Sequence, residues 1–256
     1  MKRLFFKGRF IFSIAWLLFY AAFLSLTSCN DSSNDEMEVI QEIEEEEAGN
    51  ICLSGKLYNE KDGIIRVDIE NTSVTDNGWK TENTLSGFEG EGYLVWSGND
   101  NFNTPGVGVI KFSVQINNPG TYQFVWSSRI TQGTNNTEHN DSWLRIPDAA
   151  DFYGEKAGTG ELVYPKGSGK TPNPEGSSSN GWFKVYMNNL SEWFWRSNTN
   201  DNDPYNIFAK FDTAGVYDIE ISGRSKFHAI DQFVLFKTDK SLSVAQNSAL
   251  SEIGCK

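Results

Sequence analysis

The stretch from residue 118 to residue 146 constrains the fold of this 256-residue chain more than any other part of it. Pro119 and Gly120 give a turn signal, and aromatic or aliphatic residues then alternate with smaller or polar ones over residues 121–130. An alternation with a period of two is typical of a half-buried β-strand. A second short strand is expected over residues 141–146. The sequence therefore predicts a hairpin-like pair of strands here.

The connection between these two strands, residues 131–140, holds Gln, Asn, Thr, Glu and His and has no aliphatic side chain. Buried amides and carboxylates each need a hydrogen-bond partner, so a hydrophobic core has little use for such a segment. We therefore expect this connection to form a recognition surface.

Short segments of the same kind recur along the chain, and turn residues separate them. They lie at residues 64–70, 92–96, 106–116, 182–187, 206–211, 216–222 and 229–236. A long insertion, residues 147–180, is rich in Gly, Pro, Ser and Lys, and loops of this length are usually functional or disordered. Many short strands with turn signals between them predict an all-β domain, a β-sandwich or jelly roll, over residues 51–238.

The N-terminus has the pattern of a secretory signal. The first nine residues carry four basic side chains, and residues 10–26 are almost wholly apolar. The sequence Leu26-Thr27-Ser28-Cys29 that follows resembles a bacterial lipobox, whose cysteine is lipidated after cleavage. We therefore interpret residues 1–28 as a lipoprotein signal peptide and Cys29 as the lipidated residue. The alternative is a transmembrane anchor, because the apolar run is close to spanning length.

An acidic segment, residues 29–50, follows the signal peptide. It contains no Lys or Arg and ends in a run of four Glu residues before Ala48. Self-repulsion keeps such a segment extended, so it is suited to lift a domain off a membrane. The acidic residues close to Cys29 also resemble the surface-export signal of Bacteroidota lipoproteins. We expect an outer-membrane lipoprotein exposed on the cell surface, with periplasmic residence as the alternative.

Charge and cysteine content narrow the remaining possibilities. The formal net charge is −12, and no basic stripe accompanies the aromatic residues, so a nucleic-acid partner is not expected. Cys52 and Cys255 flank the domain, and they could pair in an oxidising compartment. The tail, residues 239–256, has the composition of a flexible segment, so the sequence leaves the pairing open.

Four pieces of the chain, in this order, resemble carbohydrate-binding modules of families 6 and 35. They are Val67-Asp68-Ile69-Glu70, Gly92-Tyr93-Leu94, the segment 114–129 with Pro119-Gly120-Thr121-Tyr122 at its centre, and Ile230-Asp231-Gln232-Phe233. The resemblance implies a galactose-binding-like jelly roll. It also implies a structural Ca²⁺ between the first and last strands, with Asp68, Glu70 and Asp231 as ligands. Such ligands suit the ion, because Ca²⁺ prefers hard oxygen donors and residues at i and i+2 share one face of a strand. The alternative is that these carboxylates lie on a solvated face.

The same resemblance implies a glycan site in loops at one end of the sandwich, where an aromatic ring stacks on a sugar and polar groups bind its hydroxyls. The candidate ligand-binding residues are Arg129, Glu138, His139, Asn140, Asp141, Trp182, Trp193, Trp195 and His228. Alternatives remain open. Arg129 could instead pair with Asp141 or Glu138, and one of the two faces of the Trp193-Phe194-Trp195 segment is expected to belong to the core.

The sequence lacks the catalytic motifs of several enzyme classes. Glycosidases need two positioned carboxylates, and the Glu-x-Asp-x-x-Glu strand of laminarinase-type jelly rolls is absent. With only two histidines, there is little scope for His-based metal or triad chemistry. We therefore expect a non-catalytic lipoprotein that binds a polysaccharide or oligosaccharide for glycan-degrading enzymes or an outer-membrane importer. The alternatives are a jelly-roll lyase or hydrolase, with Glu138 and His139 in its site, and a protein-binding adhesion protein.

Overall fold

The structure is a computed structural model that describes residues 52, 55–72, 74 and 77–256. The chain divides into two units, residues 1–49 and 50–256. The predicted signal peptide, the predicted lipidation site Cys29 and the predicted acidic spacer lie outside the described residues. No helix of the described part is long and apolar enough to cross a membrane.

Strands dominate the described part of the chain, and the predicted all-β jelly-roll class is confirmed. The strands are β1 (Lys56–Asn59), β2 (Ile64–Asp68), β3 (Trp79–Glu82), β4 (Tyr93–Trp96), β5 (Ile110–Ile116), β6 (Gly120–Ile130), β7 (Asp141–Arg145), β8 (Asp151–Glu155), β9 (Leu162–Val163), β10 (Ser178–Ser179), β11 (Trp182–Tyr186), β12 (Phe194–Trp195), β13 (Asn198–Thr199), β14 (Tyr205–Phe211), β15 (Gly215–Ser222), β16 (His228–Lys237) and β17 (Ile253–Cys255). A 3₁₀ turn, η1 (Ile69–Asn71), and a short helix, α2 (Leu242–Gln246), complete the elements.

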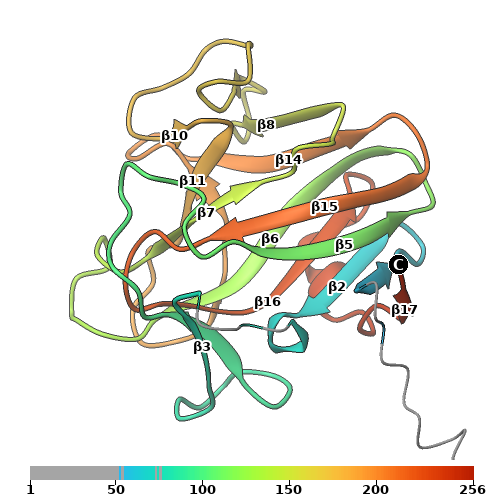
Figure 1. Ribbon diagram of the computed structural model, residues 1–256. Coiled ribbons are helices and arrows are strands. Elements are labelled where there is room, and N and C mark those ends of the chain that lie inside the picture. Colours follow the sequence, from blue (N-terminus) through green and yellow to red (C-terminus); the bar gives the residue numbers. More distant parts are fainter. Residues whose placement is uncertain (1–51, 53–54, 73, 75–76) are drawn as a thin grey trace, which may run out of the picture. The chain divides into compact units, whose positions relative to one another are not determined.

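The strands form two layers (Figure 1). The first sheet has the order β8-β14-β6-β16-β2, with β4 beside the start of β16. The second sheet has the order β17-β1-β5-β15-β7-β11, in which β1 runs parallel to β5 and the other neighbours are antiparallel. The short strand β13 pairs with both β11 and β14, so it joins the two sheets along one side.

The core fills the space between the sheets. Tyr122, Phe124 and Trp126 of β6 are fully buried, as their alternation in the sequence predicts. Across the layers, the rings of Phe112 on β5 and Phe233 on β16 lie 5.2 Å apart between centroids. Val125, between Phe124 and Trp126, points to the outer face of the first sheet, where it packs in a second cluster with Val234, Phe236 and Ala245.

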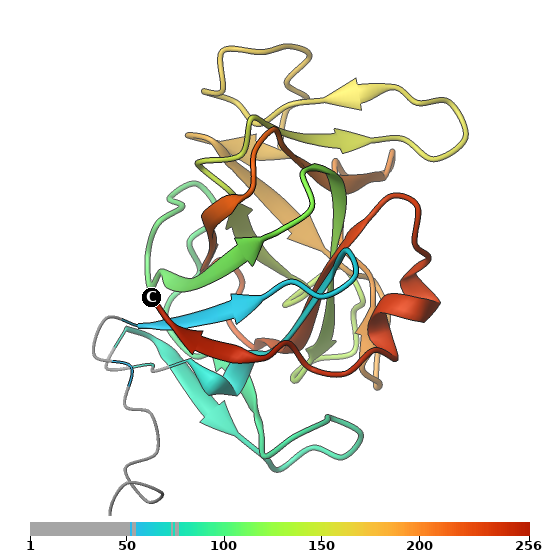
Figure 2. The same ribbon diagram turned by 90° about the vertical axis from the view of Figure 1, so that its right-hand side faces the viewer.

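The structure differs from expectation in the long insertion and in the tail. The insertion, residues 147–180, contributes β8, which pairs with β14, together with β9 and β10. The expectation of a flexible tail is wrong, because α2 packs its Ala245 against Val234 and Phe236 of β16. The last strand, β17, then pairs with β1 (Figure 2), and Cys52 and Cys255 form a disulfide.

Candidate functional site

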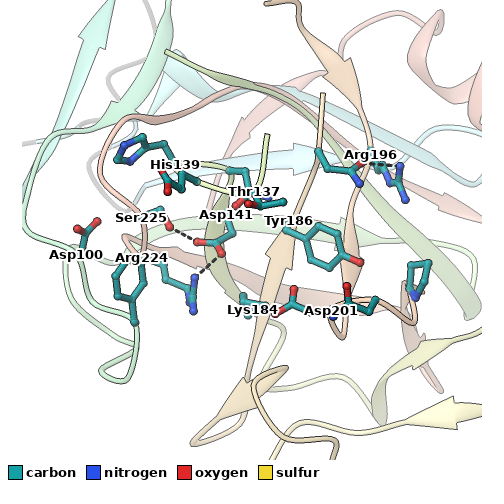
Figure 3. A pocket seen from close by; sticks show the side chains of 16 residues that line it. Asp100, Thr137, His139, Asp141, Lys184, Tyr186, Arg196, Asp201, Arg224 and Ser225 are labelled. Atoms are coloured by element: carbon teal, nitrogen blue, oxygen red, sulfur yellow. Dashed lines mark hydrogen bonds and ion pairs between the residues drawn. The ribbon is translucent and has the colours of Figure 1, made fainter. Parts of the chain in front are cut away.

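A hollow of about 840 Å³ lies over the outer face of β11 and the start of β7 (Figure 3). Phe183 and Val185 of β11 belong to the core, so Lys184 and Tyr186 between and after them face the hollow. Six connections supply the remaining walls. They are β4–β5 with Asp100 and Phe102, β6–β7 with residues 137–140, β11–β12 with Asn188, β12–β13 with Arg196, β13–β14 with Asp201, and β15–β16 with Arg224 and Ser225. We refer to this cavity as the first hollow.

Asp141 anchors one wall of the first hollow. Its carboxylate forms an ion pair with Arg224 and accepts a hydrogen bond from the hydroxyl of Ser225, as Figure 3 shows. The Arg224 guanidinium also lies 5.0 Å from the ring centroid of Phe102 and 5.1 Å from that of Trp143. A guanidinium held by a carboxylate and two aromatic rings keeps a single orientation beside the hollow. Its Nε is buried without a hydrogen-bond partner among the described residues.

Lys184 and Arg196 supply the other two cations. Lys184 is almost completely buried and pairs with the more exposed Asp201. Burial and, after it, the charge of Asp201 raise the pKa of Tyr186, so this phenol stays neutral. Arg196 donates to the side-chain oxygens of Asn198 and Asn188 at 2.6 and 2.8 Å.

The first hollow also contains side chains that remain accessible to a ligand. Half of the Phe102 side chain is exposed, which is unusual for a ring of this size. The Glu138 carboxylate is exposed at the rim, and Asp100 accepts a 2.8 Å bond from the Lys226 backbone N–H. An open ring beside fixed donors and acceptors can stack on an apolar face and bind hydroxyl groups.

The structure brings together four of the predicted ligand-binding residues, Glu138, His139, Asn140 and Asp141, in the first hollow. Asn140 is buried there, and its amide donates to the Met187 carbonyl at 2.6 Å, so it supports the wall. The alternative pairing of Asp141 with Arg129 is wrong, because Arg224 takes this position.

The other predicted ligand residues lie elsewhere. On β6, Arg129 donates to the Ser86 carbonyl at 3.0 Å. Two of the tryptophans pack on the outer face of the first sheet: Trp193 has its ring 5.0 Å from that of Tyr93, and Trp195 packs against a cluster containing Val125. Trp182 is buried beneath the Arg145 guanidinium, which is 4.5 Å from its ring centroid.

The expectation that His228 binds a ligand is wrong, because its imidazole is fully buried. Its Nδ1 lies 2.8 Å from the Ser142 hydroxyl, and its ring packs 5.6 Å from that of Trp126. Burial lowers the pKa of His228 to about 3, so the ring is neutral. The structure therefore makes His228 a core residue beneath β7.

Sequence reasoning missed Phe102, Lys184, Tyr186, Arg196 and Arg224. One signal was available for two of them, because Lys184 and Tyr186 alternate with core residues in a segment that was expected to be a strand. The other three lie in connections or at their ends, whose path depends on the completed fold.

A second cluster, which we call the acidic cluster, contains Asp68 at the end of β2, Glu70 in η1 and Asp231 of β16. Asp231 is 3% exposed, and its Oδ2 accepts a bond from the Glu89 backbone N–H at 3.3 Å. Its Oδ1 and the Oε2 of Glu70 are buried without a hydrogen-bond partner among the described residues. Burial and the charges of Glu70, Asp68 and Glu89 raise the pKa of Asp231 to about 8.

Burial is also the first cause of raised pKa values at Asp68 and Glu70. Asp68 accepts a hydrogen bond from Gln232, and Glu70 accepts one from the Glu91 backbone N–H at 2.9 Å. Within the described part of the chain, no group of three or more His, Cys, Asp or Glu side chains converges as a metal-binding set.

Comparisons with known proteins give distant similarities only. No protein-family model matches the chain, and no curated protein matches it significantly. Among solved structures, a Podospora anserina GH26-CBM35 β-(1,4)-mannanase matches with a TM-score of 0.40 and 13% identity over 71% of this chain and 29% of its own. A Paenibacillus cycloisomaltooligosaccharide glucanotransferase matches with a TM-score of 0.37 and 15% identity, over 69% of this chain and 19% of its own. An Arthrobacter globiformis isomalto-dextranase gives the same TM-score and identity, over 69% of this chain and 24% of its own. The chain therefore spans less than a third of the length of these three proteins.

Proposed function

We propose that this chain is a non-catalytic glycan-binding protein and that the first hollow is its glycan site. The observation that carries this proposal is the half-exposed ring of Phe102 beside the fixed guanidinium of Arg224, in a cavity whose other walls are mostly polar. A sugar ring has apolar C–H faces and a rim of hydroxyl groups, so it needs both features. The volume, about 840 Å³, is sufficient for a small oligosaccharide.

The charged groups of the hollow favour binding over catalysis. Lys184 and Arg224 are each held in an ion pair, and the raised pKa of Tyr186 keeps this side chain protonated, so little phenolate is present to act as a general base. The second candidate function is a polysaccharide lyase or glycoside hydrolase, because Glu138 and His139 lie together in the same hollow. The two functions differ in whether product accumulates.

The test is affinity electrophoresis of the full chain in detergent, through gels that contain one polysaccharide each. The panel comprises glucomannan, xylan, mixed-linkage β-glucan, galactan, polygalacturonate and alginate, and each sample is also assayed for reducing ends and unsaturated products. Retardation without product is the expected result. Product formation would establish the enzyme, and the absence of both signals would contradict the proposal and favour a protein partner.

We further propose that the protein lies on the outer membrane, held by a lipid on Cys29 and exposed to the medium through the acidic spacer. There it would pass captured glycan to degrading enzymes or to an importer. The expected result is that radiolabelled palmitate is incorporated by the wild type and not by Cys29→Ala, and that protease added to intact cells digests the protein. Protection until the outer membrane is permeabilised would instead indicate the periplasmic location.

We also propose that the acidic cluster holds a structural Ca²⁺, with Asp231 and Glu70 as ligands and Asp68 beside them. The support is chemical, because two buried carboxylate oxygens without partners are the donors that a hard cation takes. A bound cation would supply the positively charged partner that these two oxygens do not have among the described residues. The expected result is a higher melting temperature in Ca²⁺ than in chelator, and an unchanged value would contradict the assignment.

A further inference from the structure

A second hollow of about 420 Å³ lies next to the first. Its polar walls include Lys80 and Glu82 of β3, Gln132 and Lys226. Two connections contribute residues to both cavities. The β6–β7 connection gives residues 131 and 132 to the second hollow and 137–140 to the first, while the β15–β16 connection gives Lys226 and Phe227 to the second hollow and the two preceding residues to the first.

A ridge of two rings lies where the hollows adjoin. His139, which lines the first hollow, meets Phe227, which lines the second, edge to face at 5.2 Å between ring centroids. Both residues adopt positive φ, 56° and 70°, a region that bulky side chains rarely occupy.

Hydrogen bonds hold the backbone of Phe227 in this conformation. Its N–H donates to the Trp96 carbonyl at 2.8 Å, and its carbonyl accepts from the backbone N–H of Thr131 at 3.1 Å and from the Thr131 hydroxyl at 2.9 Å. Unfavourable backbone conformations that the surrounding bonds enforce are common at ligand-contacting positions. These bonds therefore fix the position of the Phe227 ring between the two cavities.

The charges of the two hollows offset one another. The first hollow has one more carboxylate than cations, and the second has one more cation than carboxylates. The members are Lys184, Arg196, Arg224, Asp100, Glu138, Asp141 and Asp201 in the first, and Lys80, Lys226 and Glu82 in the second. A polyanionic chain gains nothing from such a balance, whereas an uncharged ligand bound by hydrogen bonds does not need a net charge.

We propose that the two hollows are consecutive subsites of one groove, which binds an internal stretch of an uncharged polysaccharide across the His139–Phe227 ridge. This inference rests on the proposed glycan-binding function. It adds that the ligand is a neutral chain longer than one hollow can hold, with sugar residues in both cavities.

The test combines ligand length with variants of the second hollow. Oligosaccharides of the neutral polysaccharide that retards the protein (a dimer, a tetramer and a hexamer) are titrated calorimetrically into the full chain. We expect the hexamer to bind roughly tenfold more tightly than the dimer, because a few additional hydrogen bonds form in the second hollow. Gln132→Ala and Lys226→Ala are expected to remove most of this gain, and Lys166→Ala, an exposed lysine outside both hollows, is expected to keep it.

The outcomes separate the two proposals. If no polysaccharide of the panel binds, the glycan-binding function fails and the groove fails with it. If a neutral glycan binds with the same affinity at all three lengths, or if the variants keep the full gain, the groove is overturned and the function stands. Retention only by polygalacturonate or alginate would overturn the neutral-ligand assignment.

Discussion

The first hollow and the acidic cluster both gather carboxylates, yet their surroundings differ. In the hollow, buried Asp141 has Arg224 and Ser225 as partners, and Lys184 has Asp201. In the acidic cluster, Asp231 retains an unpartnered oxygen and a pKa raised to about 8. A site whose buried charges are already paired can hold a neutral ligand without a further charge, whereas buried carboxylates without partners favour a proton or a cation.

The largest expected effect comes from breaking the pair in the hollow. Arg224→Ala leaves the buried Asp141 carboxylate without its cation, and we expect a loss of about 3 to 5 kcal/mol in the free energy of unfolding. Urea denaturation measures this loss. The control is Lys210→Ala, whose pair with Asp212 is exposed to solvent and is expected to contribute little to stability. Equal losses in both variants would show that Asp141 does not depend on Arg224.

The next effect concerns His228, whose imidazole is fully buried beneath β7. The folded-state pKa of His228 is about 3, well below the value of about 6.5 for an unfolded chain, because of burial. Its contribution to stability is present above pH 6.5 and is lost as the pH falls toward the folded value. We expect this loss to approach about 1.4 kcal/mol per pH unit.

His228→Asn is expected to flatten this acid dependence in urea titrations between pH 7 and pH 4, even though it lowers the stability at neutral pH. His139→Asn changes a partly exposed ring in the hollow and is the matched control. An unaltered acid slope in His228→Asn would contradict the burial assignment.

Asp231→Asn tests the acidic cluster, where the stability is expected to change with pH in the direction opposite to that at His228. The folded-state pKa of Asp231, about 8, is raised above that of an unfolded chain, so its contribution is lost as the pH rises toward 8. In chelator at pH 8, we expect the variant to be more stable than the wild type by roughly 1 to 3 kcal/mol. In Ca²⁺, this order is expected to reverse, because the variant lacks a ligand.

Thermal melting with and without Ca²⁺ measures both parts of this prediction. Asp218→Asn is the control, because the Asp218 carboxylate accepts bonds from Ser113 and Lys111 at 2.7 and 3.1 Å and has no need of a further cation. This control is expected to be less stable than the wild type in both conditions. If Asp231→Asn were also less stable than the wild type in both conditions, the claim that the acidic cluster differs from the first hollow in its unpartnered carboxylates would be contradicted.

The β-strands could be predicted from the sequence because alternation is a local property. The segment 121–130 falls within β6, and its aromatic residues are in the core. The polar connection after it supplies residues 137–140 to the first hollow for the same reason, since a run of amides and hydroxyls has no place in a core. The residues predicted as calcium ligands lie on β2, η1 and β16, and β2 and β16 are paired in the structure.

What the sequence did not show depends on contacts that are distant along the chain. Arg224 reaches Asp141 from 83 residues away, and β17 pairs with β1 after α2 has packed on β16. Tryptophan was expected to mark the ligand site, but Trp182 is buried, and Trp193 and Trp195 pack on the first sheet. The exposed ring of the hollow is Phe102, in a connection without a periodic pattern.

The most direct test of the glycan site compares two exposed apolar residues of similar accessibility. Phe102, in the first hollow, is 50% exposed, and Val216, on β15 outside it, is 42% exposed. Phe102→Ala and Val216→Ala are each titrated with the polysaccharide that retards the wild type. We expect Phe102→Ala to remain folded and to bind roughly five- to tenfold more weakly, because the stacking ring is lost, and Val216→Ala to bind as the wild type does. Equal affinities for all three proteins would contradict the central claim that the first hollow is the glycan site.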